Sequence, residues 1–296
     1  MGLRVDTYRC KLCGACQEID PDTFEVDEKA GELTVREREH PDPGLLEQAA
    51  AWCPAHCIEV TPDDPPDRKD DEERLSTEDY EKGMILQKDR KSYAMVPHFP
   101  LGIMTPEECR RVADAAEKYN VSMLKITSSM RLALIGVAPE NVHDAWAATG
   151  MQAGAAKGPC IRSIRACPGT EYCRLAKQDA LKLGMELDAR YHGMSLPAKL
   201  KIAVSGCVNQ CAENCIRDIG LHGKNDGWVI TIGGNGGARP SLAQPFASGL
   251  DDAEAMLTVD KLIKFYSEKA KKFDRMSKLI KRTGIENIKK AIDLRD

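Results

Sequence analysis

The chain has 296 residues and a formal net charge of −4, from 42 basic and 46 acidic side chains. This length allows two ordinary domains with buried cores, and the near balance of charge argues against a nucleic-acid-binding protein. No apolar run approaches the ~20 residues that span a bilayer, and the start, MGLRVDTYRC, lacks a signal peptide's apolar stretch, so we expect a cytoplasmic protein that does not enter membranes.

Twelve cysteines are the strongest signal in the composition. Disulfides are rare in the reducing cytoplasm, so this many thiols indicates metal binding rather than covalent cross-links.

Residues 1–61 contain the first cysteine cluster. A CxxCxxC motif and a distant Cys-Pro pair supply four thiols, those of Cys10, Cys13, Cys16 and Cys53. A 4Fe-4S cube needs four thiolates from different directions, which a tight loop of three and one remote cysteine can provide. Gly14 lets the backbone bend beside a ligand. A zinc site is the alternative, and the triple spacing with the trailing proline favours the cube.

The two-cluster bacterial pattern would require a further cysteine at position 20, where this chain has Asp20 and Pro21. A single cluster therefore fits better than two. Cys57 matches no ligand position, and we expect it to be a buried thiol. This segment resembles the single-cluster bacterial ferredoxins over nearly all of its 60 residues, including the PDTF that follows the third cysteine.

Residues 62–82 are rich in proline and acidic residues and nearly free of apolar ones, which predicts a solvated linker.

Beyond the linker, SYAMVP predicts a strand, and Thr105, Pro106 and Glu108 have the pattern of an N-cap, a first helical residue and a capping box. The helix that follows has an apolar stripe, which we assign to Val112, Ala113 and Ala116. Cys109 lies on the same helix and is predicted to be a small core residue. SMLKITSSMRLALIGV predicts one or two strands, and NVHDAWAATG a short helix closed by Gly150.

Helices and strands alternate through the remaining residues. The chain ends in two amphipathic helical stretches separated by Gly284, whose Lys-rich faces we interpret as solvated surface.

The second cysteine cluster consists of two pairs, each after a strand-like run, PCIRSIRA or LKIAVS. The pairs place four thiols in loops that can face a common point, those of Cys167, Cys173, Cys207 and Cys211. Spacing alone favours a 4Fe-4S cube and a zinc site about equally.

Basic residues accompany these loops. Five of them lie on or beside strand-like segments: Arg131, Arg162, Arg165, Lys199 and Lys201. The spacing of the two lysines predicts that they share one face of a strand. Like charges gathered on one surface are unfavourable unless an anion binds there. The Gly-rich loop IGGNGGARP, residues 232–240, can bring backbone N–H groups close to carboxylates or phosphates.

The motifs CPGTEYC, GCVNQC, LPAKLK and GGNGGARP resemble those of the siroheme-containing sulfite and nitrite reductase family, from about residue 83 to the C-terminus. The pattern is similar to the low-molecular-weight assimilatory-type sulfite reductases, and KITSSMR and SGCVNQCAE also resemble the NADH-dependent nitrite reductases. The N-terminal ferredoxin segment is an addition to the smallest members.

This resemblance implies an α+β fold in four segments: a 4Fe-4S ferredoxin-type domain (1–61), an acidic Pro-rich linker (62–82), a ferredoxin-like α+β half-domain (83–150), and a siroheme and 4Fe-4S α/β domain with C-terminal helices (151–296). It also implies two 4Fe-4S clusters and a siroheme. The second cluster would be held by the four paired cysteines, with Cys211 bridging to the siroheme iron.

Siroheme carries eight carboxylates, which the basic residues could bind. The resemblance implies that four of them bind the substrate anion, the siroheme or both: Arg131, Arg162, Lys199 and Lys201. Contacts to siroheme alone are implied for Arg165, Asn209, Gly233, Gly234, Asn235, Gly236, Gly237 and Arg239. Cys215 then has no ligand position left, and we expect a packed thiol on a helix after the ligand loop.

Two departures from the family pattern stand out. Many larger members have arginine two residues after the threonine of the KIT segment, where this chain has Ser129, and its arginine follows at Arg131. Larger members also contain two copies of the reductase unit and this chain one, so a homodimer could replace the missing half.

The implied reaction is the six-electron reduction of sulfite to sulfide, or of nitrite to ammonia, with electrons from a low-potential donor protein entering through the N-terminal cluster. The residues do not decide between the two anions, and the pattern favours sulfite. A non-catalytic electron-transfer or cofactor-carrying subunit is a rival interpretation, although conduction alone would not need the basic residues. A zinc-binding interaction module is a third.

Overall fold

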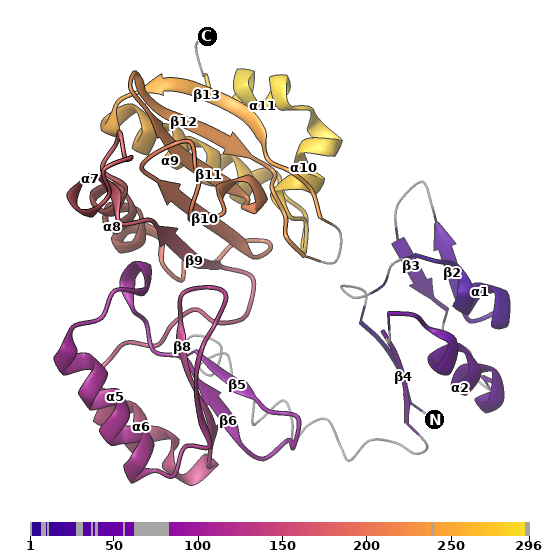
Figure 1. Ribbon diagram of the computed structural model, residues 1–296. Coiled ribbons are helices and arrows are strands. Elements are labelled where there is room, and N and C mark those ends of the chain that lie inside the picture. The colour runs from indigo at the N-terminus through magenta and orange to yellow at the C-terminus, as the bar shows by residue number, and fades with distance from the viewer. Residues whose placement is uncertain are drawn as a thin grey trace. The chain divides into compact units, whose positions relative to one another are not determined.

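The computed structural model describes residues 2–6, 10, 12–27, 32–36, 38, 41–55, 57–61, 83–237 and 240–293. These residues form two compact units, drawn in Figure 1. The first unit holds the described residues up to Thr61, and the second those from Gly83 to Gly236 and from Pro240 to Asp293. The expected linker, 62–82, lies outside the described residues. Helices and sheets are mixed in both units, as the predicted α+β class requires.

The first unit contains two short helices and two antiparallel strand pairs. The pairs are β1 (Gly2–Val5) with β4 (Ile58–Thr61) and β2 (Phe24–Asp27) with β3 (Glu32–Val35). The helices are α1 (Ala15–Ile19) and α2 (Pro43–Trp52). The Asp42 side chain caps α2 by accepting the Gly44 N–H at 2.8 Å.

Asp20, which stands where a second-cluster cysteine would be, has a structural role in this unit. Its carboxylate is buried and accepts the Thr23 N–H at 3.2 Å, which closes the turn between α1 and β2. The position is therefore used for a turn and not for a metal ligand.

The second unit begins with a four-stranded antiparallel sheet of order β5-β6-β8-β7. Its strands are β5 (Met84–Leu86), β6 (Tyr93–Met95), β7 (Met123–Ile126) and β8 (Leu132–Val137). Two helices pack against each other beside it, α5 (Pro106–Lys118) and α6 (Val142–Thr149) (Figure 1). Short 3-10 turns precede them, η1 (Pro100–Gly102) and η2 (Pro139–Asn141). The core of this half includes Met95 and Leu134, both fully buried.

The predicted helix start and helix end in this half are confirmed. Thr105 and Glu108 form a capping box with Pro106 at the first helical position, and Gly150 closes α6 in the left-handed conformation.

Two predicted positions on α5 are wrong. Ala113 is exposed, and the buried residues of the helix are Val112 and Ala115, three positions apart. Cys109, which we expected in the core, is exposed as well. Both side chains lie just off the stripe that faces the sheet, and a modest stripe of alanines fixes the buried face poorly.

The remainder of the second unit is a five-stranded mixed sheet of order β13-β12-β11-β10-β9. The strands are β9 (Ile161–Ala166), β10 (Leu200–Ser205), β11 (Ile219–Lys224), β12 (Gly227–Ile232) and β13 (Gln244–Leu250). β9, β10 and β11 run parallel to one another. β12 runs antiparallel to β11, and β13 runs antiparallel to β12. The two strands predicted before the paired cysteines, β9 and β10, are confirmed and adjacent.

Helices cover this sheet. They are α7 (Gly169–Tyr172), α8 (Ala180–Tyr191), α9 (Asp252–Lys269), α10 (Met276–Thr283) and α11 (Ile285–Ala291), with a 3-10 turn, η3 (Asn214–Ile216). α8 packs on β9 and β10, and α9 packs on β12 and β13 and contacts α8. The core between them includes Trp228 and Tyr266, both fully buried.

The C-terminal region has three helices where the sequence predicted two. α9 ends at Lys269, and Phe273 has a positive φ of 66° in the turn before α10. The carboxylate of Asp274 in that turn is buried and pairs with Arg282. The apolar period continues across the turn, so periodicity alone could not locate the break. Gly284 separates α10 from α11 as predicted.

In the part of the chain that the structure describes, no helix combines the length and apolarity needed to cross a membrane.

Candidate functional site

Five thiols of the first unit line one small cavity. Four belong to the predicted ligands, Cys10, Cys13, Cys16 and Cys53, and the fifth is Cys57. Of these only Cys13 is exposed. The cavity therefore gathers the CxxCxxC loop and the remote cysteine, as a four-thiolate metal site requires.

The backbone around this cavity is shaped for sulfur ligands. Leu12 and Gly14 have positive φ values of 53° and 79°, which turn the chain tightly between the cysteines. The Leu12 N–H points at Cys10 Sγ, 3.4 Å away, and the Cys57 N–H at Cys53 Sγ, also 3.4 Å away. Such N–H groups stabilise the negative charge of a thiolate.

Cys53 and Cys57 differ in acidity although their Sγ atoms are 3.2 Å apart. Burial acts to raise the pKa of Cys53, but hydrogen bonds from the backbone and side chain of Cys57 outweigh it and lower that pKa. Burial, and then the hydrogen bond to Cys53, raise the pKa of Cys57. Cys53 is the better thiolate of the pair, as a ligand should be.

The second set of cysteines lies at the carboxyl ends of the parallel strands β9 and β10. Cys167 directly follows β9, Cys173 ends α7, and Cys207 lies two residues after β10. The Gly206 N–H donates to Cys167 Sγ at 3.1 Å and joins the two loops. A Cβ at Gly206 would lie 2.7 Å from the Gln178 carbonyl oxygen, so only glycine allows this approach.

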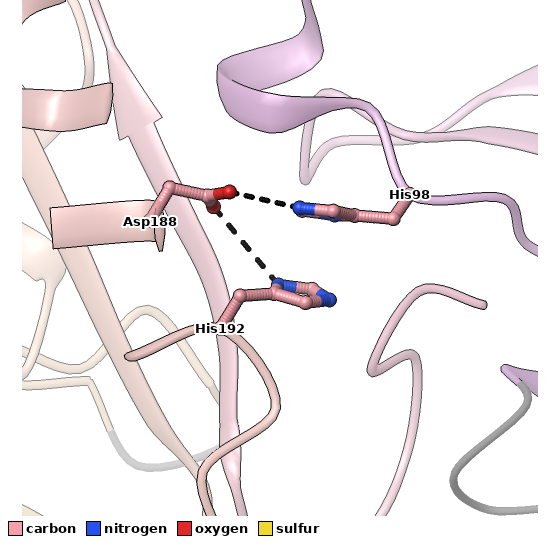
Figure 2. A group of neighbouring side chains, drawn as sticks. All are labelled: His98, Asp188 and His192. Atoms are coloured by element: carbon pink, nitrogen blue, oxygen red, sulfur yellow. Dashed lines mark hydrogen bonds and ion pairs between the residues drawn. The ribbon is translucent and has the colours of Figure 1, made fainter. Parts of the chain in front are cut away.

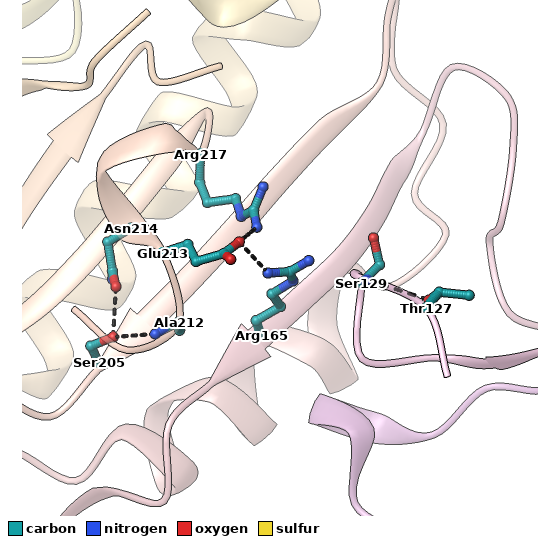
Figure 3. A network of polar contacts seen from close by, with 8 residues as sticks. All are labelled: Thr127, Ser129, Arg165, Ser205, Ala212, Glu213, Asn214 and Arg217. Atoms are coloured by element: carbon teal, nitrogen blue, oxygen red, sulfur yellow. Dashed lines mark hydrogen bonds and ion pairs between the residues drawn. The ribbon is translucent and has the colours of Figure 1, made fainter. Parts of the chain in front are cut away.

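The loop from Cys207 to Glu213 exposes Cys211 while Cys207 stays buried. Gln210 and Glu213 have positive φ values of 49° and 62°. A buried network holds the loop: the Ser205 hydroxyl donates to Asn214 Oδ1 at 2.6 Å and accepts the Ala212 N–H at 3.1 Å (Figure 3). Cys211 is thereby presented at the surface on a fixed loop, which suits a thiolate that faces a second group.

Our prediction for Cys215 is wrong. It lies in the 3-10 turn η3 and not on a helix, and its side chain is exposed and not packed.

The spacing of the thiols bears on the choice between zinc and a cube. Tetrahedral zinc with Zn–S bonds of about 2.3 Å would bring its sulfurs to about 3.8 Å from one another. Among the described residues, which include all twelve cysteines, the only group of three possible ligands with atoms all within 4.8 Å is His98, Asp188 and His192. Neither cysteine set forms such a group among the described residues.

Next to the second set, the structure gathers the basic residues. Burial first, and then Arg162 and Arg165, lower the pKa of Arg131 to about 10. Burial and four neighbouring cations lower the pKa of Lys201 to about 8; the cations are Arg217, Arg275, Lys199 and Arg165. We call these seven side chains, Arg131, Arg162, Arg165, Lys199, Lys201, Arg217 and Arg275, the cation cluster. All five basic residues predicted from the sequence belong to it.

The sheet explains part of this grouping. Arg165 on β9 pairs with Ala203 on β10, two residues after Lys201, so Arg165 and Lys201 project from the same face. Lys199 directly precedes β10. The register shift between Leu200 and Lys201 comes from an extra residue on β9, Arg162, so the common face of the two lysines stays a prediction.

Two carboxylates of the described residues pair with members of this cluster. Glu213 pairs with Arg165, 2.7 Å away, and with Arg217 (Figure 3). Asp218, fully buried, accepts from Arg275 Nη2 at 2.7 Å and from the Lys201 N–H at 2.8 Å. The Nε atoms of Arg165 and Arg217 are buried and have no hydrogen-bond partner among the described residues. A group of cations in which two buried Nε–H donors have no partner fits a ligand that carries several carboxylates.

The Gly-rich loop also reaches this region. Asn235 accepts from Arg275 Nη1 at 3.2 Å. A Cβ at Gly234 would lie 2.5 Å from the Arg217 carbonyl oxygen, so this glycine serves close backbone packing. Gly233 is buried, Gly236 and Gly237 are exposed, and Asn209 is exposed on the cysteine loop. Arg239 lies outside the described residues.

Sequence reasoning missed several residues of this site. Arg217, Arg275, Glu213 and Asp218 belong to no recognised motif, and Arg275 is 57 positions from its partner Asp218. Only CIRD, next to the cysteine loop, could have suggested Arg217.

Comparisons with known proteins agree with this arrangement. Residues 157–296 match the model of the nitrite and sulphite reductase 4Fe-4S domain, and residues 85–151 that of the nitrite/sulfite reductase ferredoxin-like half domain. Residues 5–60 match the 4Fe-4S single cluster domain of ferredoxin I.

Two curated relatives differ in how much of their length the chain covers. The assimilatory-type sulfite reductase of Nitratidesulfovibrio vulgaris is 40% identical over 214 residues, which are 72% of this chain and 98% of that protein. The NAD(P)H nitrite reductase of Bacillus subtilis is 31% identical over 208 residues, 70% of this chain and 26% of that protein.

Among solved structures, Mycobacterium tuberculosis NirA aligns with a TM-score of 0.65 at 19% identity, over 75% of this chain and 47% of that one. Dissimilatory sulfite reductase I aligns with a TM-score of 0.62 at 12% identity, over 69% of each chain. These two likenesses confirm the predicted fold class.

Two cysteines that line the first cavity, Cys10 and Cys57, should behave differently on substitution. We expect Cys10→Ala to lose the N-terminal cluster, and with it about half of the iron and acid-labile sulfide, because a cube needs its four thiolates. Cys57→Ala, the matched control, should keep the full content, since its thiol has a raised pKa. Iron and sulfide analysis of purified protein measures both, and a loss of iron in Cys57→Ala would make Cys57 a ligand.

Proposed function

The chain belongs to the nitrite and sulfite reductase family, and on that basis we propose that this oxidoreductase reduces sulfite to sulfide with six electrons, using siroheme. The observation that carries the proposal is the cation cluster beside four cysteines at the carboxyl ends of β9 and β10. A protein that only conducts electrons has no need for seven gathered cations.

We assign the cofactors to residues as follows. The first 4Fe-4S cluster would be bound by Cys10, Cys13, Cys16 and Cys53. The second would be bound by Cys167, Cys173, Cys207 and Cys211. Siroheme, when bound, supplies the iron at which the anion is reduced, and its carboxylates match the unused Nε donors of Arg165 and Arg217.

The remaining cations would act on the substrate. Arg131 and Arg162 are half-buried, and each guanidinium can hold a small oxyanion through two parallel N–H groups. Lys199 and Lys201 offer compact ammonium groups, which stabilise negative charge as S–O bonds break and can donate a proton. Lys201 suits proton donation best, because its pKa of about 8 lies close to neutral pH.

We further propose that electrons enter through the N-terminal ferredoxin domain. Support comes from the gathered thiols of that domain and from its match to single-cluster ferredoxins. A low-potential donor protein would deliver them.

Reduction of nitrite to ammonia is the second candidate. Nitrite reductases of several organisms are 30 to 35% identical to about the same part of this chain. Sulfite is preferred because the sulfite reductase relative is matched along 98% of its length.

Steady-state assays with a low-potential dye as donor test the choice of substrate. We expect a brown-green protein with a chlorin-type absorption band, and a higher kcat/KM for sulfite than for nitrite. A higher value for nitrite would reverse the assignment. A colourless protein that contains zinc would refute the redox function altogether.

Lys201 should matter for turnover and not for assembly. Loss of one donor from a preorganised polar site lowers the rate by about a hundredfold or more, so we expect Lys201→Ala to lower kcat at least that much. Siroheme and iron content should stay at the wild-type level. Unchanged turnover would remove Lys201 from the site.

The pH dependence should show the titration of Lys201. Its ammonium is charged below its pKa and neutral above it, and burial with four cationic neighbours sets that pKa at about 8 before siroheme carboxylates bind. The carboxylates of bound siroheme raise the pKa of Lys201, so activity should fall as the pH rises above about 8. The pH–rate profile of Lys201→Arg, which stays charged, should lack this fall, and the same fall in that variant would assign it to another group.

A further inference from the structure

Outside the cation cluster, a second polar group lies where the two halves of the larger unit meet. It consists of His98, Asp188 and His192 (Figure 2). His98 lies between β6 and η1, Asp188 is on α8, and His192 directly follows α8. The half-domain contributes one of these side chains and the mixed sheet's helix the other two.

The two imidazole rings face one carboxylate. His98 Nε2 lies 2.8 Å from Asp188 Oδ2, and His192 Nδ1 lies 4.0 Å from Asp188 Oδ1. The rings are stacked, with centroids 3.4 Å apart and planes 19° from parallel. Asp188 is 4% exposed, and its charge also acts on Arg131, whose protonated form it favours.

This geometry does not suit a metal ion. In-plane lone pairs of two stacked rings point side by side and cannot converge on one cation. The 2.8 Å between His98 Nε2 and Asp188 Oδ2 is a hydrogen-bond distance that leaves no space for an ion between them.

The contacts of His192 determine where its proton lies. His192 Nε2 is 3.3 Å from the Ala155 nitrogen, whose N–H can only donate, so Nε2 must carry the lone pair. The proton of the neutral ring is then on Nδ1. That atom is buried, has no hydrogen-bond partner among the described residues, and faces Asp188. Burial, and then His98, lower the pKa of His192 to about 4, which keeps the ring neutral.

The carbonyl group of the same residue, Ala155, which belongs to the next peptide unit, holds Arg131. The carbonyl oxygen of Ala155 accepts from Arg131 Nη2 at 2.8 Å. Burial and repulsion from Arg162 and Arg165 disfavour this guanidinium where it stands, so it needs an anchor. Ala155 lies between the half-domain and β9 in a stretch with no regular helix or strand, and the hydrogen bond from its N–H to the His192 ring restrains the backbone that carries its carbonyl group.

We infer that His192 is a positioning residue for Arg131, with Asp188 and the stacked His98 orienting the His192 ring. A chain of contacts from Asp188 through His192 and the backbone of Ala155 then positions the arginine that meets the substrate anion. The inference rests on the proposed function, in which Arg131 binds that anion. Arg131 stands two residues after Ser129, the position at which many larger family members have their arginine. In this chain the guanidinium would be held in place by a histidine from the other half of the unit.

Equilibrium binding of sulfite to the oxidised holoenzyme, followed by the change in its siroheme absorption, tests this role. We expect His192→Leu, which removes the acceptor for the Ala155 N–H, to raise the sulfite Kd about tenfold, the effect of one lost buried hydrogen bond. His192→Gln keeps an acceptor near the position of Nε2 and should bring the Kd to within about threefold of wild type. His143→Leu, at an exposed histidine of α6, is the matched control and should leave it unchanged.

A double-mutant cycle separates positioning from general stability. In an Arg131→Ala background, His192→Leu should change the Kd by less than about twofold, because the residue it positions is absent. Siroheme and iron content of every variant verify that it has folded. A tenfold loss that persists without Arg131, or an unchanged Kd in His192→Leu, would overturn the positioning role. A wild-type protein that carries siroheme but binds neither sulfite nor nitrite would contradict the proposed function instead.

Discussion

The larger unit depends on one electrostatic constraint: seven cationic side chains gather beside a cysteine loop, where the exposed Glu213 and the buried Asp218 pair with some of them. Burial, and then the neighbouring cations, lower the pKa of Lys201 to about 8 and that of Arg131 to about 10. Asp218 and Glu213 hold the cluster in place without neutralising it. An anion with several carboxylates, and a small anion beside it, would complete the charge balance, which is why the family's reaction suits this surface.

The sheet brings the redox and the anionic chemistry together. Parallel strands place their carboxyl ends on one edge, so the loops after β9 and β10 meet, and the Gly206 N–H joins them at Cys167. The same two strands carry Arg165 and Lys201 on one face. Thiols at the strand ends and cations along the strands are therefore consequences of a single pairing of two strands.

Local sequence patterns predicted the elements that local chemistry determines. The capping box at Thr105, the glycine that ends α6 and the strands before the paired cysteines all depend on neighbouring residues, and all are present. Burial was predicted less well. Cys109 and Cys215 are exposed, since small apolar side chains are tolerated on either face of an element, and the turn at Asp274 is fixed by ion pairs that no periodicity reveals.

Motif spacing in the sequence was enough to identify the family and the single-cluster ferredoxin segment and to propose the two cysteine sets, because the ligands of one loop stand at fixed intervals along the chain. It also identified five members of the cation cluster. The three-dimensional fold was needed to show that Arg217 and Arg275 join them. It also showed that His98, Asp188 and His192 meet beside Ala155, whose carbonyl group holds Arg131. These partners are up to 90 positions apart, and packing between sheet, helices and half-domain, not any local pattern, brings them together.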